Sequence, residues 1–560
     1  MKHKEFSPEK KDRKKIIRGS IQGVLLIFLL IIVIKAIFTF KEYKPYDSNS
    51  INTVDNGFIA ISYFGVDRNG TNTLISTESL DNQLKALKEN GYVTITQQDV
   101  LDYYKNGKVL PEKALLLLFE DGRTDTAIFS QKIMEEYNYK ATMLTYADKF
   151  SKIDSKFLMP KDLKKLVKST YWELGTNGYR LEYINVFDKE ENYLGELTSI
   201  EFSKLSNTIR REYNHYLMDY IRDENNIPKE TYSELNNRID YDYEKLYEVY
   251  NKELGEVPQL YALMHSNTGS FGTNEKVSYI NEMWIKELFS MNLNREGSSL
   301  NTKESSVYDL TRIQPQAFWS TNHLLMRIWD DTKENINFVI GDEKRAKSFQ
   351  KINGEVEFKD DTIILTSLPK AQGTIKLIDS DDYKNINLSV ELNGNIIGSQ
   401  AVYLRANNDL KNNLKFKIIN NTVEITESIN GKEELIYSKD LNVDRDIEYI
   451  DINEAGNKKV NIKLNGNKLD VTLDGEIIVD GLEVKHLGEG SILLESSWGE
   501  YGYSQRNIAD DVYDGVFKKL KVTEIDDTVL FDSSLKGFEL IKYNGKKYLK
   551  NVINWFITNL

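Results

Sequence analysis

An apolar run ends on two adjacent acids in the stretch LLLLFEDGRTD, residues 115–125. Glu120 and Asp121 directly follow four leucines and a phenylalanine, and when neighbouring carboxylates are enclosed together, the pKa of one of them rises. Such a pair can move a proton during hydrolysis or hold a hard cation through its oxygens. The same residues also fit a polar turn that closes a buried strand. Asp125 and Arg123 are expected in the following loop and helix start, with Asp125 as a cap or an ion-pair partner.

The composition limits the class of protein before any motif is weighed. The chain has 560 residues, five histidines, no cysteine and a formal net charge of -13. This length favours two or more domains. The acidic balance argues against sequence-independent binding to nucleic acid, which requires a basic face. The lack of cysteine excludes disulfides, thiolate metal sites and cysteine nucleophiles.

The first forty residues combine a basic tail with an apolar segment. Residues 1–18 are rich in lysine and arginine. Residues 19–40 are almost wholly apolar, and about 22 such residues are enough to cross a hydrocarbon core as a helix. Basic residues before the span predict a cytoplasmic N-terminus. The sequence therefore predicts a single-pass protein of the cell membrane, with a linker at 41–56 and its bulk outside the cell; the alternative is a buried helix of a soluble protein.

Strand-like and helix-like segments alternate over residues 57–330. Apolar runs such as GFIAISYF, ALLLLF and KATMLTYA are separated by amphipathic stretches such as SLDNQLKALKENGY. Continuous apolar strands between helices are typical of a parallel sheet covered on both faces, and we expect a deformed α/β barrel. Residues 182–257, charged and rich in tyrosine, are expected to form a helical insertion. Chemistry in such barrels gathers at the carboxyl ends of the strands, where Glu120 and Asp121 stand.

These segments, in this order, resemble the polysaccharide deacetylase (NodB-homology) family from about Gly57 to Trp329. The opening strand ends in YFGV, where many members have Tyr-His-x-Val, and FEDG stands where members have Phe-Asp-Asp-Gly. By this resemblance Glu120 holds the position of the general base and Asp121 that of a metal ligand. RIQP, from Arg312, resembles the arginine-bearing strand near the end of the domain, which implies a role in substrate binding.

The resemblance implies a hydrolase in which a divalent metal polarises a carbonyl and lowers the pKa of its bound water. Members usually supply one aspartate and two histidines, the latter in a His-Ser/Thr-x-x-His segment. In the matching segment, YWELGTNGYRLEY, the two histidine positions hold Asn177 and Leu181. The implied ligand set is thus reduced to Asp121 with Asn177, which leaves oxygen-only ligation of a divalent cation. No other cofactor is expected.

Two further strand ends offer polar candidates for the same site. His265, in YALMHSNTGSFG, is expected to act as an acid or as an additional metal ligand. The alternative is a half-buried imidazole without a chemical role. Asn294, Arg295 and Glu296 follow another strand, and Arg295 is assigned to substrate binding. The alternative for these three residues is a solvated loop.

Helix signals nearly vanish after about residue 335. Short alternating runs divided by Asn-Gly, Asp-Gly and Asn-Asn turns predict an antiparallel β-sandwich over residues 335–528, followed by a C-terminal strand and tail at 529–560. In general shape the sandwich resembles the concanavalin A-like domains that bind or cleave glycans. Stacking on sugar rings requires exposed aromatic side chains, and we assign Trp498 and Tyr501 to substrate binding.

Other polar residues of the second half have simpler interpretations. Arg405 is a candidate polar group beside the aromatic platform. His323 and Arg327, four residues apart on one expected helix, are predicted to make an interdomain contact. Three acids near the end of the sandwich could hold a structural calcium ion or form a plain acidic loop: Asp510, Asp511 and Asp514.

Three functions are consistent with this sequence. The first is a membrane-tethered hydrolase that removes acetyl groups from a cell-envelope or exported polysaccharide. The second is a catalytically inactive glycan-binding or assembly protein that retains the fold. The third is a metal-independent glycosidase with Glu120, Asp121 or Glu173 as acid and base, which requires two carboxyl groups across a groove. In each case the expected partners are a polysaccharide, the membrane and the machinery of polysaccharide synthesis.

Overall fold

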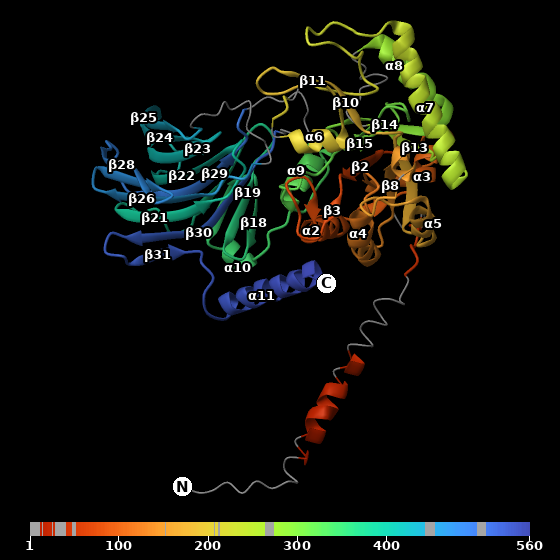
Figure 1. Cartoon of the computed structure of the whole chain (residues 1–560). Helices are drawn as coiled ribbons and strands as arrows, with labels where there is room; N and C mark the ends of the chain where they lie inside the picture. The colour runs from red at the N-terminus through yellow and green to blue at the C-terminus, as the bar shows by residue number, and fades with distance from the viewer. Residues whose placement is uncertain are drawn as a thin grey trace.

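The computed structural model has two β-rich bodies, one a barrel with helices around it and the other a sandwich (Figure 1). The structure describes residues 12–13, 15–24, 26–28, 41–47, 52–151, 153–206, 208–210, 213–263, 274–442, 454–500 and 511–559. The expected α/β barrel and the β-rich C-terminal region are both present.

Within the described residues, seven neighbouring parallel strands form the wall of the barrel. In spatial order they are β2 (Phe58–Tyr63), β7 (Ala114–Phe119), β8 (Ala141–Tyr146), β9 (Trp172–Gly178), β13 (Leu260–Ala262), β14 (Met291–Glu296) and β16 (Leu310–Arg312). A parallel bridge between Ile61 and Ile313 joins the last strand region back to the first. The Ile313 N–H donates to the Ala60 carbonyl at 3.1 Å. The sheet therefore curls almost completely round on itself.

The alternation of side chains along the strands decides what faces the interior. In β7, Leu115 and Leu117 belong to the core shared with the surrounding helices. Leu116 and Leu118 belong to a second core together with Ala60 of β2. Because successive side chains of a strand point to opposite faces, residue 120 lies on the same side as Leu116 and Leu118. The chain therefore places Glu120 directly above the apolar layers of the barrel.

Helices surround this sheet and short strands extend it. The helices of the barrel region are α2 (Thr77–Glu89), α3 (Gln97–Asn106), α4 (Thr124–Tyr137), η1 (Ala147–Ser151), α5 (Pro160–Lys168), α7 (Tyr232–Leu254), α8 (Glu275–Leu288) and α9 (Thr321–Thr332). The short strands are β1 (Thr53–Val54), β3 (Val66–Asp67), β4 (Ile75–Ser76), β5 (Val93–Thr94), β6 (Leu110–Pro111) and β15 (Leu300–Asn301). Residues of α3 belong to the interior core of the barrel, on the side away from the strands' carboxyl ends.

Among its described residues, the insertion at 182–257 contains one short helix in its first half and one long helix, α7, in its second. β10 (Glu182–Phe187) and β11 (Tyr193–Thr198) form a hairpin, which β12 (Asn214–His215) extends and α6 (Ser199–Leu205) covers. The expectation of helix is therefore wrong for 182–198. Asp188 explains the difference, because its side chain accepts from the Glu190 and Asn192 N–H groups and fixes a turn that reverses the chain.

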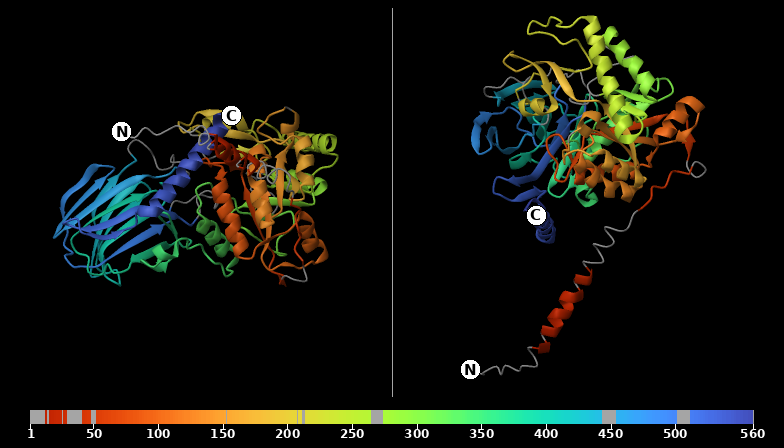
Figure 2. Two further views of the ribbon diagram at one scale, coloured as in Figure 1. Left: turned by 90° about the horizontal axis from the view of Figure 1, so that it is seen from below. Right: turned by 45° about the vertical axis from the view of Figure 1, so that its right-hand side comes forward.

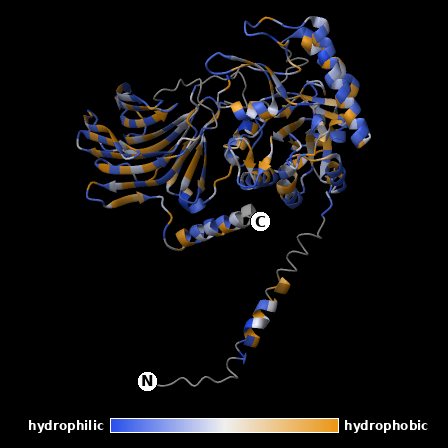
Figure 3. Ribbon diagram, viewed as in Figure 1, coloured by the Kyte–Doolittle hydropathy of each residue, from blue (hydrophilic) through white to orange (hydrophobic). Residues whose placement is uncertain are grey.

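The sandwich consists of two antiparallel sheets. The first contains, in spatial order, β17 (Phe349–Asn353), β20 (Gln372–Leu377), β29 (Ser491–Ser497), β22 (Ser399–Ala406), β23 (Asn413–Ile419), β24 (Thr422–Ile429) and β25 (Lys432–Asp440). The second contains β18 (Glu355–Lys359), β19 (Thr362–Thr366), β30 (Asp514–Glu524), β21 (Ile386–Leu392), β26 (Lys458–Asn465), β27 (Lys468–Leu473) and β28 (Glu476–Glu483). Hydrophobic and hydrophilic residues alternate along many of these strands (Figure 3), so that one face of each sheet meets the shared core.

A buried polar junction joins the barrel to the sandwich. Asp514, at the start of β30, accepts from the N–H and hydroxyl of Ser320, which caps helix α9. It also accepts from the hydroxyl of Thr366 at 2.6 Å and lies 3.2 Å from Nδ1 of His323. The predicted interdomain contact of His323 is confirmed. Asp514 therefore belongs to this junction, and the calcium interpretation is not needed for it.

The two ends of the chain differ from the expected linker and tail. Tyr43 lies against the barrel, where its N–H donates to Thr170 Oγ1 at 2.8 Å. After β31 (Val529–Asp532), which pairs with β30, the expected tail is a 23-residue helix, α11 (Gly537–Asn559). α10 (Glu343–Ala346) lies between the two bodies in sequence.

The segment expected to cross the membrane, 19–40, is described only in part. Residues 15–24 and 26–28 are helical, whereas 25 and 29–40 lie outside the described residues. In the part of the chain that the structure covers, no helix is both long enough and apolar enough to span a membrane.

The junction predicts a sharp effect of Asp514→Ala on stability. The substitution leaves the buried donors of Ser320 and Thr366 without their acceptor, and we expect a loss of about 3 kcal/mol in the free energy of unfolding. Urea denaturation measures this loss. The matched control is Asp480→Ala, at an exposed position of β28. Equal stability of the two variants would contradict the proposed importance of the junction.

Candidate functional site

Polar side chains gather at the carboxyl ends of the barrel strands. Because the strands are parallel, these ends meet at one rim of the barrel. The set comes from six strands or the residues directly after them and includes Ser62, Glu120, Asp121, Tyr146, Asn177, Glu296, Arg312 and Gln314. The rim is thus a polar layer that lies on top of an apolar interior.

Glu120 is the centre of this layer and is completely buried. Its Oε1 accepts from the Ser62 hydroxyl at 2.6 Å, from Gln314 Nε2 at 2.7 Å and from Arg312 Nε at 3.0 Å. Its Oε2 accepts from Asn177 Nδ2 at 3.3 Å. A buried carboxylate is tolerated only when such donors and an opposite charge replace water. The charge of Glu120 inside the barrel is therefore compensated by Arg312 and by the neutral hydrogen-bond donors.

Arg312 is shared between two acids. Its side chain is fully buried, and Nη2 donates to Glu296 Oε1 at 3.3 Å in addition to the contact with Glu120. Burial lowers the pKa of Arg312, but the charges of Glu120 and Glu296 more than offset this effect, so that its pKa is raised. The structure thus places the predicted substrate-binding arginine inside the rim, where it holds Glu120.

Asp121 has the opposite environment. Its backbone is left-handed, with φ of 64°, and its N–H donates to Asn177 Oδ1 at 3.3 Å. Although the residue as a whole is partly exposed, its Oδ1 is buried and has no hydrogen-bond partner. Burial and the neighbouring Glu120 raise the pKa of Asp121 to about 7, against weaker opposing effects of Arg123 and Lys149. Asp121 can therefore gain or lose a proton near neutral pH.

Tyr146 completes the group around Asp121. It ends β8, is 2% exposed, and its hydroxyl is buried without a hydrogen-bond partner. Burial raises the pKa of this phenol, and the charges of Asp121 and Glu120 raise it further. The rim thus contains a protonated phenol beside a carboxyl group that titrates near neutrality.

The metal implied by the family resemblance does not fit the described donors. Asn177 uses its oxygen on the Asp121 N–H and its amide on Glu120 and on the Ala262 carbonyl. Leu181, at the second histidine position, packs against the Tyr183 cluster of the insertion. Among the residues that the structure describes, no group of three or more histidine, aspartate or glutamate side chains could hold a metal ion.

Four predicted site residues remain, of which the structure describes two. His265 and Tyr501 lie outside the described residues. Arg295 is in β14, where its backbone pairs with Thr311. Trp498 follows β29 in the sandwich and is half-buried.

Two side chains considered in the sequence have structural roles away from the rim. Glu173 is near the amino end of β9 and accepts from the Gln97 N–H at 3.0 Å, so it cannot form an acid pair with Glu120 at the opposite end. Arg405 is buried and donates to the carbonyls of Lys384, His486 and Gly466. The prediction of Glu173 as a glycosidase acid or base is therefore wrong, and so is that of Arg405 as a polar group beside the aromatic platform.

Three residues of the rim are not among those predicted from the sequence: Ser62, Tyr146 and Gln314. Each stands at the carboxyl end of an apolar barrel strand or just after it, in ISYF, MLTYA and RIQP. A polar side chain at such a position is the signal that could have identified them, since the ends of all parallel strands meet at the rim.

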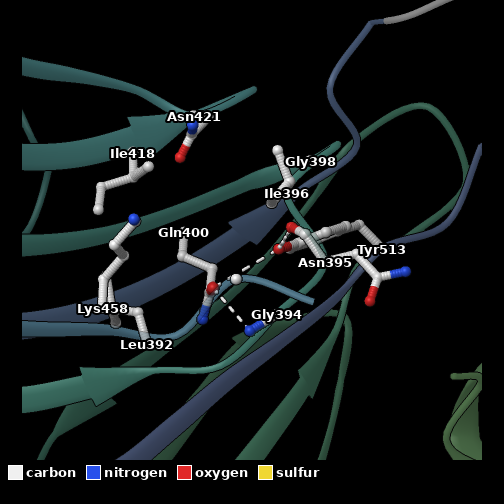
Figure 4. Close-up of a pocket in the computed structure, with 11 residues that line it drawn as sticks. Leu392, Gly394, Asn395, Ile396, Gly398, Gln400, Ile418, Asn421, Lys458 and Tyr513 are labelled. Carbon is white, nitrogen blue, oxygen red and sulfur yellow. Dashed lines mark hydrogen bonds between the residues drawn. The ribbon is translucent and has the colours of Figure 1, made fainter. Parts of the chain in front are cut away.

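The sandwich has a small hollow of about 20 Å³ (Figure 4). Gln400 Oε1, which points into it, accepts from the Gly394 N–H at 3.1 Å, and the Tyr513 hydroxyl donates to the Asn395 carbonyl at 2.7 Å. This volume fits a water molecule rather than a sugar ring. The hollow is therefore too small for a sugar, and neither Trp498 nor any other described residue assigned to substrate binding lines it.

No protein-family model matches the chain. Over 70 residues, or 12% of the chain, it is 37% identical to the poly-β-1,6-N-acetyl-D-glucosamine N-deacetylase of Escherichia coli (strain K12). The chain resembles polysaccharide deacetylases. The match spans about a tenth (10%) of the length of that curated relative.

Two solved structures are each similar to a part of the chain. The deacetylase domain of BpsB from Bordetella bronchiseptica is 14% identical, with 47% of this chain and 97% of that one covered and a TM-score of 0.36. The carbohydrate-binding module CBM66 from Bacillus subtilis is 17% identical, with 31% and 94% covered and a TM-score of 0.24.

The raised pKa of Asp121 predicts a pH-dependent stability. Between about pH 4 and pH 7 Asp121 keeps its proton in the folded protein but releases it in the unfolded chain. The stabilisation by the protonated carboxyl group is therefore complete below pH 4 and is lost as the pH rises through 7. Asp121→Asn removes this loss. The free energy of unfolding of the variant minus that of the parent chain should be roughly 2 kcal/mol larger at about pH 8 than at pH 4. This is about half of what the full pKa shift would give, because the residue is partly exposed.

Urea denaturation over this pH range tests the prediction. Asp125→Asn is the matched control, because Asp125 is exposed in the first turn of α4. A stability difference between Asp121→Asn and the parent chain that is constant with pH would show that Asp121 has an ordinary pKa.

Proposed function

We propose that this chain binds a polysaccharide at the rim of its deacetylase-like barrel. The residues at the family's base position and at one metal-ligand position, Glu120 and Asn177, instead form hydrogen bonds within the protein. The observation that carries the proposal is the pairing of Glu120 with Arg312 and Asn177. The likeness to a deacetylase of a poly-N-acetylglucosamine supports a glycan of that class as the ligand. Asp121, with its buried unpartnered oxygen, is the acceptor available to a sugar hydroxyl or amide.

A second candidate is hydrolysis of an acetyl group without the family's metal set. It is favoured by Asp121 and Tyr146 together, since a carboxylate that titrates near neutrality can take a proton from water while a neighbouring phenol donates to a developing negative charge. In this case Asp121, rather than Glu120, would act as the base, because three donors already converge on one oxygen of Glu120. His265 remains the candidate acid.

The cellular setting belongs to the same proposal and is supported by the sequence. Residues 1–18 would lie in the cytoplasm, and residues 19–40 would cross the cell membrane. Both bodies would then lie outside the cell, next to the machinery that makes or exports the polysaccharide.

Binding of a β-1,6-linked N-acetylglucosamine pentamer to the full chain in detergent tests the first candidate. We expect calorimetric binding that persists in EDTA, with no release of acetate. Asp121→Asn should weaken binding about tenfold, the cost of losing a charged acceptor. Asp125→Asn, exposed and outside the rim, should leave binding unchanged.

The second candidate makes a different prediction for the same samples. Acetate release that persists in EDTA and falls at least about 100-fold in Asp121→Asn would replace binding by hydrolysis. Acetate release that EDTA abolishes would contradict both candidates.

A further inference from the structure

The C-terminal helix α11 has two distinct sides. Residues spaced three, four or seven apart place five apolar side chains of α11 on one side: Phe538, Ile541, Tyr548, Leu549 and Val552. The opposite side carries Leu540 and Tyr543 together with all the charged residues of the helix: Glu539, Lys542, Lys546, Lys547 and Lys550. With one acid and four lysines, the helix is basic in a chain whose net charge is -13.

The polar side of α11 makes its contacts with the protein. Glu539 lies 3.6 Å from Arg345 Nη2, and Lys550 Nζ lies 3.2 Å from Glu78 Oε2. Exposed ion pairs of this kind contribute about 0 to 1 kcal/mol each. The helix is therefore attached to the body by weak polar contacts.

The apolar side faces away from the protein. Phe538 is 78% exposed, Ile541 67%, Tyr548 73% and Leu549 59%. A helix of a globular protein normally turns such a side toward the core, and packing of that side supplies most of its stability. The exposed side of α11 therefore has the character of a surface that is covered by another partner.

The charges of α11 favour an anionic lipid surface as that partner. Lysines at the border of an apolar face reach the headgroup region while aromatic and aliphatic side chains enter the acyl boundary. Each lysine near an anionic surface adds about 1 kcal/mol of attraction. A second copy of this acidic chain would offer the lysines no such uniform field. α11 also lies on the side of the molecule from which residues 41–47 lead toward the N-terminus (Figures 1 and 2).

We propose that α11 lies flat in the interface of an anionic membrane, with its apolar side in the lipid. The assignment does not depend on what the barrel binds. Together with an N-terminal tether, a second attachment of this kind would restrict how the barrel rim can turn relative to the membrane.

The absence of cysteine from the chain allows a direct test with single labels. Ile541→Cys and Leu549→Cys each carry an environment-sensitive bimane in the full chain, reconstituted into liposomes with doxyl-labelled lipids as quenchers. The matched control is Ile477→Cys, because Ile477 is also an isoleucine and is 70% exposed in the sandwich. We expect about twofold quenching at both positions of α11 when the liposomes contain phosphatidylglycerol, and little at residue 477.

Replacing the lipid or the charges should reverse this result. Quenching at 541 should fall to the level of 477 in pure phosphatidylcholine, at high salt, or after joint replacement of Lys542, Lys546 and Lys547 by glutamine. Quenching that is equal in both lipids would overturn the electrostatic assignment. If shielding of the label at 541 in detergent increases with protein concentration, the apolar side of α11 binds a second copy of this chain instead of lipid. A label exposed in every condition would overturn the proposal entirely.

Discussion

The barrel rim depends on the compensation of one buried charge, that of Glu120. A carboxylate without contact with water must receive hydrogen bonds and an opposite charge from the protein. Here they come from Ser62 after the middle of β2, Asn177 in β9, Arg312 at the end of β16 and Gln314 just beyond it. These residues are 57 to 194 positions away from Glu120 in the sequence. A single side chain thus ties together strands on different sides of the barrel.

This constraint separates two adjacent acids into two roles. Glu120 points into the barrel and has all the partners it needs, whereas Asp121 has a left-handed backbone and keeps a buried oxygen without a partner. Burial and the charge of Glu120 raise the pKa of Asp121 to about 7. In the proposed function Asp121 is therefore the group that meets the ligand, whereas Glu120 holds the strands together. The same difference explains why the family's metal positions do not form a ligand set among the described residues.

The sequence predicted much of the framework but not the network. The apolar runs ALLLLF and KATMLTYA identified the strands of the barrel, and the period of two along β7 is enough to place Glu120 above Leu116 and Leu118. The partners of Glu120 could not be predicted, because nothing local to Ser62 or Gln314 records which strand ends meet. The hairpin at 182–198 was missed because tyrosine-rich, charged sequence fits a helix or an edge strand equally well until the Asp188 turn is recognised.

A double-mutant cycle on Glu120 and Arg312 tests the central claim most directly. Arg312→Met leaves the Glu120 charge buried and should cost about 4 kcal/mol in the free energy of unfolding, measured in urea. Adding Glu120→Gln should restore a large part of this loss, since it removes the uncompensated charge. The surface pair Lys351 and Glu355, 2.7 Å apart with Lys351 exposed and Glu355 half-buried, is the control and should show a coupling below about 1 kcal/mol. If the two substitutions at the rim simply add, the buried charge pair does not hold the barrel together and this account is wrong.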